Sequence, residues 1–250
     1  NKTFYLHSIP QSLFYAMARC FFAATLVGLV HVYPSGNPFN SLIQLEYEKG
    51  IPRNPFINPG AIVIADMLTS HFGNNAYENI LHYFQKSSNN FAIEIDTEIA
   101  SSELESGYRN YALANLMKSF GNIKNPIDTV LHTYFNACSI RANTVCLSRS
   151  VLHLANQGID PITEHTLLCV EHSKRINALM LTCGHYDASG EFAYRIGLPG
   201  KSGVGGGIVV IVPDIMSIAV YSPALNHHGN SLIGTKALEL FTRYSGHTIF

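Results

Sequence analysis

The chain has 250 residues, of which 47% are hydrophobic and 13% are charged, and its formal net charge is −1. This length and composition suit one large domain or two closely packed subdomains. The sparse and balanced charge argues against a nucleic-acid-binding protein and against an acidic disordered tail.

The five cysteines form no CxxC pair and follow no regular spacing. An odd number of cysteines without a framework is typical of buried free thiols in a reducing compartment. We therefore expect a cytoplasmic protein.

Residues 12–32 form a long apolar segment that is interrupted by Arg19 and His31. Its length admits a membrane span, but a charged side chain near its middle is costly in lipid. Neither a basic n-region nor a small-residue cleavage site accompanies it. We expect a buried helix or helix pair and no membrane partner, with a membrane segment as the less favoured alternative.

The following residues, 33–60, are rich in Pro, Gly and Asn, which predicts turns around a short helix at 41–49 and suits the wall of a site. From residue 61 onward, apolar side chains recur at three- and four-residue spacing, which predicts helices. These helices are expected at 61–68, 76–86, 106–121, 127–137, 144–157 and 172–181. Asn143 is the predicted N-cap of the fifth helix, and Gly158 is its predicted stop.

The periodicity changes after Tyr186, where short alternating and β-branched segments are separated by turn residues. Antiparallel strands are predicted at 191–197, 207–212 and 217–221. A final helix is predicted at 231–244, with Asn230 as its N-cap. The expected order is therefore a long helical block, three strands and a terminal helix.

The glycine-rich stretch at 197–208, GLPGKSGVGGGI, has the composition of a phosphate-binding loop. A P-loop requires a glycine at the position of Arg195, and it requires a helix rather than a strand after Lys201-Ser202. Lys-Ser-Gly at the start of a strand is instead similar to the Lys-Thr-Gly element of penicillin-recognising serine enzymes, whose strand edge binds substrate. A glycine-rich strand that only packs against a helix remains the alternative.

Four long motifs occur in one order, at PSGNPFNSL (34–42), GIPRNPFINPGA (50–61), SGYRNYALANLMKSFGN (106–122) and GLPGKSGVGGGIV (197–209). Together they resemble the motifs of the serine-dependent bacterial glutaminases, and the resemblance runs from Phe4 to the C-terminus. It implies an α/β (α+β) fold of the β-lactamase/transpeptidase type, in which helices flank an antiparallel sheet beside a helical subdomain. Residues 1–250 would form one domain, with the helical subdomain at 61–185 and the sheet strands and terminal helix at 186–250.

The resemblance also implies a function, the deamidation of L-glutamine to L-glutamate and ammonia by a homo-oligomer (a dimer or homotetramer) without cofactor or metal. It assigns substrate-site roles to Ser8, Asn58, Glu103, Asn110, Tyr134, Tyr186 and Val204. Ser8 would be the nucleophile, and its backbone N–H would form the oxyanion hole with that of Val204. Tyr186 would join them in catalysis.

A carboxylate at Glu103 suits the α-ammonium group of the substrate, and an amide at Asn110 suits its α-carboxylate. Taken alone, these residue types also fit other roles. Asn58 fits a turn, Glu103 fits a solvated charge at a helix start, and the two tyrosines fit a hydrophobic core.

The chain departs from the family at the nucleophile's motif, because the lysine expected three residues after Ser8 is Gln11. An amide cannot accept the serine proton, so the base would have to be Tyr186 or a water that it holds. The family glutamate before PSG is Tyr33, and the family's N-terminal portion has no counterpart in the chain. We expect a truncated or eroded glutaminase; the alternative is a catalytically impaired glutamine- or glutamate-binding relative, or a partner subunit.

Overall fold

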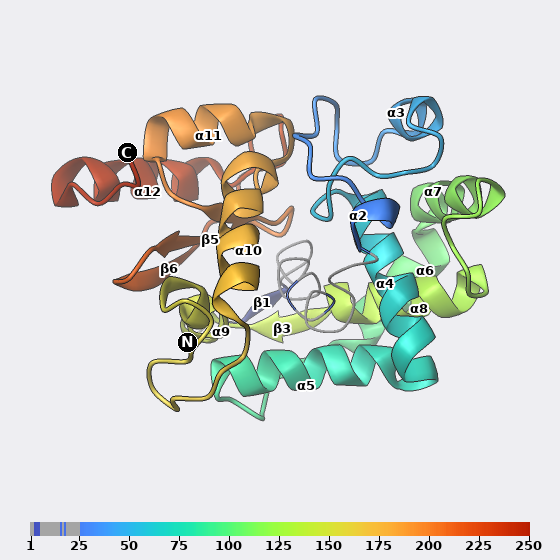
Figure 1. Cartoon of the computed structure of the whole chain (residues 1–250), viewed down its shortest axis with the longest axis horizontal. Coiled ribbons are helices and arrows are strands. Elements are labelled where there is room, and N and C mark those ends of the chain that lie inside the picture. Colours follow the sequence, from blue (N-terminus) through green and yellow to red (C-terminus); the bar gives the residue numbers. More distant parts are fainter. Residues whose placement is uncertain (1–2, 6–15, 17, 19–25) are drawn as a thin grey trace.

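A computed structural model describes residues 3–5, 16, 18 and 26–250 (Figure 1). Ser8, Gln11 and much of the apolar segment 12–32 therefore lie outside the described residues. Within that segment, Ala16 and Ala18 are buried and residues 26–29 are helical. In the described part of the chain, no helix has both the length and the apolar character needed to cross a bilayer.

Helices make up most of the described chain. They are α2 (Leu26–Leu29), α3 (Leu42–Tyr47), α4 (Asn58–Phe72), α5 (Ala76–Ser88), α6 (Thr97–Ser106), α7 (Tyr108–Ser119), α8 (Ile127–Cys138), α9 (Thr144–Ala155), α10 (Val170–Cys183), α11 (Ser189–Ile196) and α12 (Leu232–Ser245), with 3₁₀ turns η1 (Gly73–Asn75) and η2 (Tyr186–Ala188). The strands are β1 (Phe4–Tyr5), β2 (Glu94–Ile95), β3 (Ile140–Ala142), β4 (Gly200–Ser202), β5 (Gly207–Val212) and β6 (Met216–Tyr221).

The described strands form two antiparallel sheets of three strands, in the orders β1-β3-β2 and β4-β5-β6. In the second sheet Lys201 pairs with Val209, and Ile208 pairs with Val220. In Figure 1 this sheet lies on one side of the molecule with α11 and α12, whereas α3, α6 and α7 lie on the other side. Helix α9 packs on β5 and β6, and α10 packs on β4.

The central strand β5 is buried along its whole length. Val209 and Ile211 pack into the main helical core, whereas Ile208, Val210 and Val212 pack into a second cluster with α11 and α12. Successive side chains of a strand point to opposite faces, so a continuous β-branched run fits a strand that is covered on both sides. The strand predicted at 207–212 is thereby confirmed, and β6 confirms the one at 217–221.

Helix α4 is the core helix of the larger cluster, and its residues 59–69 are all buried. It packs against α5, α7 and α8. A helix whose residues are buried on every side requires other elements around it. The helices predicted at 61–68, 76–86, 127–137, 144–157 and 172–181 are confirmed as α4, α5, α8, α9 and α10.

The cap predicted for α9 is also confirmed, because the Asn143 side chain accepts a hydrogen bond from the Cys146 N–H at 2.9 Å. The helix ends at Ala155, slightly before the predicted stop at Gly158. The short helix predicted at 41–49 is confirmed as α3. The prediction at 106–121 covers α7 and missed α6, which is a separate helix.

The strand predicted at 191–197 is wrong, because these residues belong to helix α11. Phe192 and Ile196 are buried one helical turn apart, whereas Tyr194 is 91% exposed. Arg195 and Glu191 form an ion pair at 2.8 Å, at the i,i+4 spacing of a helix. The third strand of the sheet is instead β4, which contains the Lys-Ser pair.

The N-cap predicted for the last helix is also wrong by one residue. Ser231, not Asn230, accepts the capping bond, which the Gly234 N–H donates at 3.3 Å. Asn230 is buried, and its side chain donates to the His185 carbonyl at 3.3 Å. The division of the chain at 61–185 and 186–250 stays a prediction.

Candidate active site

The first part of the site is a pair of amides that come from distant parts of the chain. Asn58 begins α4 and Asn110 lies in the first turn of α7. The Asn58 side chain donates to the Asn110 side-chain oxygen at 3.0 Å. Both residues are half-buried, so the two amides are fixed relative to each other and still accessible.

The first helical turn of α4, which contains Asn58, Pro59 and Gly60, is tightly packed. A Cβ atom added at Gly60 would lie 1.9 Å from the Asn54 carbonyl oxygen, so only glycine fits. Asn54 itself is fully buried and donates to the Tyr33 carbonyl at 2.9 Å and to the Ser35 hydroxyl at 3.2 Å. These bonds join the motifs at 34–42 and 50–61 into one rigid wall.

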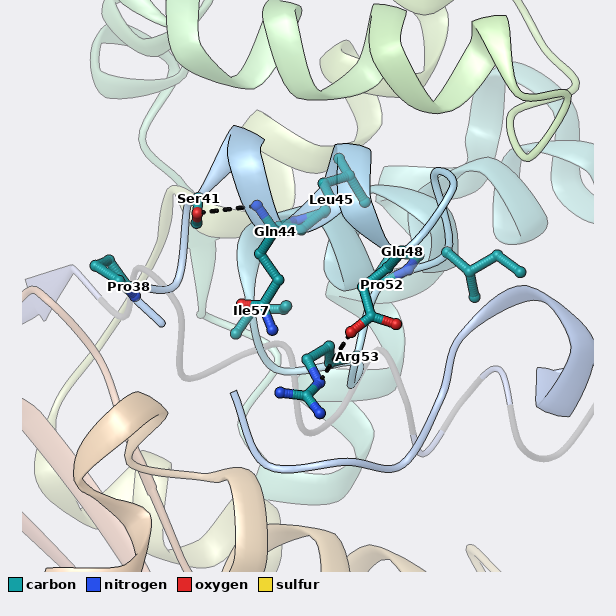
Figure 2. A pocket seen from close by; sticks show the side chains of 10 residues that line it. Pro38, Ser41, Gln44, Leu45, Glu48, Pro52, Arg53 and Ile57 are labelled. Carbon is teal, nitrogen blue, oxygen red and sulfur yellow. Dashed lines mark hydrogen bonds and ion pairs between the residues drawn. The ribbon is translucent and has the colours of Figure 1, made fainter. Parts of the chain in front are cut away.

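A small pocket of about 10 Å³ lies next to this wall (Figure 2). Its lining includes Ile57 and Pro59, the two neighbours of Asn58. An ion pair between Arg53 and Glu48 at 3.4 Å closes one side of it. The pocket has room for about one water molecule and not for an amino acid. It is therefore not a substrate pocket, and its lining residues help to hold Asn58 in place.

The second part of the site centres on Tyr134 in α8. Burial raises the pKa of its hydroxyl well above the usual range, and Cys138, Glu103 and Tyr186 act in the same direction. Tyr134 and Cys138 share a hydrogen bond, while burial raises the pKa of the thiol to about 12. Both groups are therefore neutral at pH 7.

Helix α6, which carries Glu103, packs on α8, and the Glu103 carboxylate contributes to the raised pKa values of Tyr134 and Cys138. Gly107, directly after α6, allows this approach, because a Cβ there would lie 2.5 Å from the Phe135 ring. The sequence-predicted residues Glu103 and Tyr134 are thus brought together.

The third part of the site is the 3₁₀ turn that begins with Tyr186. This side chain is 1% exposed, and its hydroxyl donates to the Ser202 carbonyl at 3.2 Å. Its ring contacts the Phe39 ring at a centroid distance of 4.8 Å, so the 34–42 motif reaches the turn. The φ angle of Tyr186 is 59°, which is uncommon for a residue with a Cβ atom and typical of strained functional positions.

The glycine-rich stretch forms β4 and the tight turn into β5. A strand follows the Lys-Ser pair, as predicted, and not the helix that a P-loop requires. The turn is closed by the Gly203 N–H, which donates to the Gly207 carbonyl at 3.0 Å. Val204 lies half-buried in this turn, and a Cβ atom added at Gly229 would lie 3.4 Å from the Val204 side chain and 3.7 Å from the Phe39 ring, so the loop at Gly229 is close to both.

Lys201 on β4 is fully buried. Its amine donates to the Ser202 carbonyl and lies 4.6 Å from the centre of the Tyr186 ring. Burial lowers the pKa of Lys201 to about 7, and Cys138 opposes this change. Our sequence analysis missed this residue as a functional group, although the Lys-Ser-Gly motif contains it.

The structure therefore brings six of the seven predicted site residues into three connected parts. Asn58 contacts Asn110, Glu103 lies beside Tyr134, and Tyr186 connects through Phe39 to the turn of Val204. Ser8 lies outside the described residues. No cluster of three or more His, Cys, Asp or Glu side chains in the described chain is placed to hold a metal ion.

Comparison with known proteins gives the same picture along the entire chain. The family model described as Glutaminase matches residues 1–250. A glutaminase of Aliarcobacter butzleri is 58% identical over 250 residues, which cover 100% of this chain and 82% of that relative.

Solved structures agree. A Bacillus glutaminase has a TM-score of 0.95 at 33% identity, covering 100% of this chain and 86% of that one. The Bacillus subtilis glutaminase YbgJ, in covalent complex with 5-oxo-L-norleucine, has a TM-score of 0.88 at 30% identity and covers 100% and 83% of the two chains. The predicted β-lactamase-like fold is confirmed, and the chain belongs to the glutaminase family.

Proposed function

We propose that this chain hydrolyses L-glutamine to L-glutamate and ammonia through an acyl-enzyme on Ser8. The observation that carries the proposal is the Asn58–Asn110 bond, which joins two predicted substrate residues from different helices. Fixed amides of this kind lower the entropy cost of binding a small polar substrate.

The amino-acid end of the substrate would lie between the amide pair and Glu103. The Asn110 and Asn58 side chains would donate to its α-carboxylate, and the Glu103 carboxylate would accept from its α-ammonium group. Tyr134 and Cys138 are neutral, so Glu103 would supply the negative charge at the binding end of the site. A single carboxylate there favours an α-amino acid over a dicarboxylate.

The reacting end would lie between Tyr186 and Val204. Ser8 would attack the side-chain carbonyl carbon, and the N–H groups of Ser8 and Val204 would stabilise the oxyanion. Ammonia would leave and water would hydrolyse the ester. YbgJ forms its covalent complex on reaction with 6-diazo-5-oxo-L-norleucine, an α-amino acid with a carbonyl at the corresponding position, which supports this arrangement.

The second candidate is a glutamine- or glutamate-binding protein without turnover, or a partner subunit. Gln11 favours it, because an amide cannot replace a lysine as a proton acceptor. This candidate predicts binding with the same wall of Asn58, Glu103 and Asn110 and no release of ammonia.

We also propose a cytoplasmic homo-oligomer, either a dimer or a tetramer. Cys138, Cys146, Cys169 and Cys183 are free thiols, which supports a reducing compartment. Ile43 and Tyr47 on α3 are 85% and 86% exposed, and apolar side chains on one helix face suit a subunit contact. Sedimentation of the purified chain tests the oligomer.

The catalytic proposal is tested by ammonia release from glutamine. The wild-type chain is expected to release ammonia, and Ser8→Ala is expected to release none, whereas Ser12→Ala serves as the matched control. Mass spectrometry after reaction with 6-diazo-5-oxo-L-norleucine should find the label on Ser8. Thermal stabilisation by glutamine without ammonia release or label would establish the binding protein instead.

A further inference from the structure

The loop between β6 and α12, at 225–231, is braced internally by one amide side chain. The Asn226 side-chain oxygen accepts hydrogen bonds from the His228 and Asn230 N–H groups, each at 3.0 Å. The Asn226 N–H in turn donates to the Asn230 carbonyl at 2.8 Å. An Asn side chain that bonds to nearby backbone groups fixes the shape of a turn. The 225–231 loop therefore holds its other side chains on a preset backbone.

Two of these side chains bind the 3₁₀ turn η2 on both sides of Tyr186. The His228 Nδ1 atom lies 2.9 Å from an Asp187 carboxylate oxygen, and because a carboxylate only accepts hydrogen bonds, the imidazole is the donor. The Asn230 side chain donates to the His185 carbonyl at 3.3 Å. The loop is therefore attached to the residue directly before Tyr186 and to the residue directly after it.

Tyr186 needs this support because its backbone is strained. Its φ of 59° lies in the left-handed region, which a residue with a Cβ atom keeps only where its surroundings fix it. The Ser189 hydroxyl supplies part of the support, since it donates to the Tyr186 carbonyl at 2.9 Å and accepts from the His185 N–H at 3.0 Å. The bonds of the 225–231 loop add to it. The place of the Tyr186 hydroxyl on the Ser202 carbonyl depends on this backbone.

The same loop contacts the turn that carries Val204. Gly229 stands between His228 and Asn230 and has a φ of 82°. Because a Cβ atom added at Gly229 would lie only 3.4 Å from the Val204 side chain, the loop backbone comes close to this turn. One loop thus contacts both turns of the reacting end, that of Tyr186 and that of Val204.

We propose that His228 and Asp187 form a positioning pair, which holds the Tyr186 turn in its catalytic place relative to Val204. The inference rests on the proposed function and adds two residues that act through Tyr186 rather than on the substrate. The His228 and Asp187 side chains are 23% and 29% exposed, so water screens their attraction and the pair adds little to overall stability. Its effect should appear in the rate, because displacing a reacting group by about 1 Å can cost about 10²-fold.

The first test is steady-state ammonia release by His228→Leu, which removes the donor of the pair. We expect kcat to fall by about 10–100-fold and KM to stay nearly unchanged, because Asn58 and Asn110 at the binding end keep their contact. An unchanged kcat, or a rise in KM alone, would overturn the proposal.

Two further variants show whether the hydrogen bond itself matters. His228→Asn keeps a donor nitrogen at the position of Nδ1, so it should retain most of the wild-type kcat. His227→Leu changes the exposed neighbour in the same loop and is the matched control, with both kinetic constants unchanged. If His228→Asn is as slow as His228→Leu, the donor is not what positions the turn and the proposal is wrong.

A double-mutant cycle tests whether the two side chains act together. Asp187→Ala alone should lower kcat about as much as His228→Leu, and the double variant should be no slower than either one. Losses that multiply would mean that the two residues act independently, against the proposal. Urea unfolding of the three variants should give free energies close to that of the wild type, which verifies that they fold.

A measurement without turnover keeps the proposal testable in an inactive chain. Carbon-13 NMR of the chain with tyrosines labelled at Cζ reports on the surroundings of the Tyr186 hydroxyl, and Tyr186→Phe assigns its resonance. His228→Leu should shift this resonance, whereas His228→Asn and His227→Leu should leave it in place. A resonance that His228→Leu does not move refutes the positioning pair, even in an active chain. A wild-type chain that releases no ammonia, while His228→Leu shifts the resonance as expected, refutes the proposed function alone.

Discussion

The two ends of the proposed site are built on opposite physical principles. At the binding end, Asn58 and Asn110 are half-buried neutral amides that satisfy each other with one hydrogen bond. At the reacting end, Lys201 and Tyr186 are fully buried, one of them has a strongly lowered pKa and the other a strained backbone. Preorganised polar groups suffice to hold a substrate, whereas proton transfer needs a group whose charged form is destabilised.

This contrast predicts that substitutions at the reacting end change kcat and that substitutions at the binding end change KM. Removing the buried Lys201 amine at the reacting end should instead raise the free energy of unfolding, because burial of its ammonium form is destabilising. Four variants test the contrast, from the largest effect to the smallest.

The largest effect is expected for Tyr186→Phe, which removes the hydroxyl that donates to Ser202. We expect kcat to fall by about 10²–10⁴-fold with little change in KM, because the hydroxyl that we propose to take part in proton transfer is lost. Steady-state ammonia release measures both constants. Tyr194→Phe, at an exposed tyrosine on α11, is the control, and a pure rise in KM for Tyr186→Phe would contradict the contrast.

The next effect is a gain in stability for Lys201→Met. The pKa of Lys201 is about 7 in the folded chain against 10.5 for the free side chain, so between these values the unfolded chain binds more protons. Stability of the wild-type chain therefore rises with pH across this window, and the cost of burial is fully present below pH 7. Lys201→Met should be more stable by several kcal/mol below pH 7.

That gain should shrink as the pH rises from 7 toward 10.5, which urea unfolding at several pH values measures. The half-exposed Lys236 provides the control, since Lys236→Met should show no such trend. A gain that is independent of pH would mean that Lys201 is not a destabilised cation.

A smaller effect is expected for Glu103→Gln at the binding end. Removing the carboxylate should raise KM for glutamine by about 10–100-fold, the worth of one hydrogen bond to a charged group, and leave kcat nearly unchanged. The exposed neighbour Glu105 offers the control Glu105→Gln. An equal fall in kcat would show that Glu103 also acts on the reacting groups.

The smallest effect is expected for Asn143→Ala, away from both ends. The lost N-cap of α9 should lower the free energy of unfolding by about 1 kcal/mol. Denaturant unfolding measures this, and both kinetic constants should stay as they are. A change in kcat would indicate that α9 influences the sheet, and it would contradict the expectation that only residues at the reacting end change kcat.

The sequence predicts most helices correctly, because their apolar residues follow the helical period over three or more turns. It fails where that signal is short or weak. Helix α11 has eight residues, and the exposed Tyr194 between Phe192 and Ile196 imitates the alternation of a strand. Helix α6 buries only Ala100, although the Asp96 side chain caps it by accepting from the Glu98 and Ile99 N–H groups at 3.1 Å.

The site divides in a similar way. Family motifs point to Asn58, Glu103, Asn110 and Tyr186, but spacing alone does not show that Asn58 and Asn110 touch. Lys201 is visible in its motif, yet its burial arises from the packing of β4 against β5 and α10, which no local pattern encodes. Functional groups whose properties depend on burial are therefore the ones that are hardest to predict from the sequence.

The two-sided strand β5 has a consequence for the way the molecule opens. Its alternate side chains belong to two hydrophobic clusters. Strand β5 can therefore leave the sheet only when both clusters open together. Amide hydrogens of Ile208 to Val212 should accordingly exchange only through global unfolding, more slowly than those of β6, which within the described residues pairs with β5 alone. The turn that carries Val204 leads directly into this slowest-exchanging strand, and so the Val204 N–H that we propose for the oxyanion hole should keep its position through smaller fluctuations of the helices.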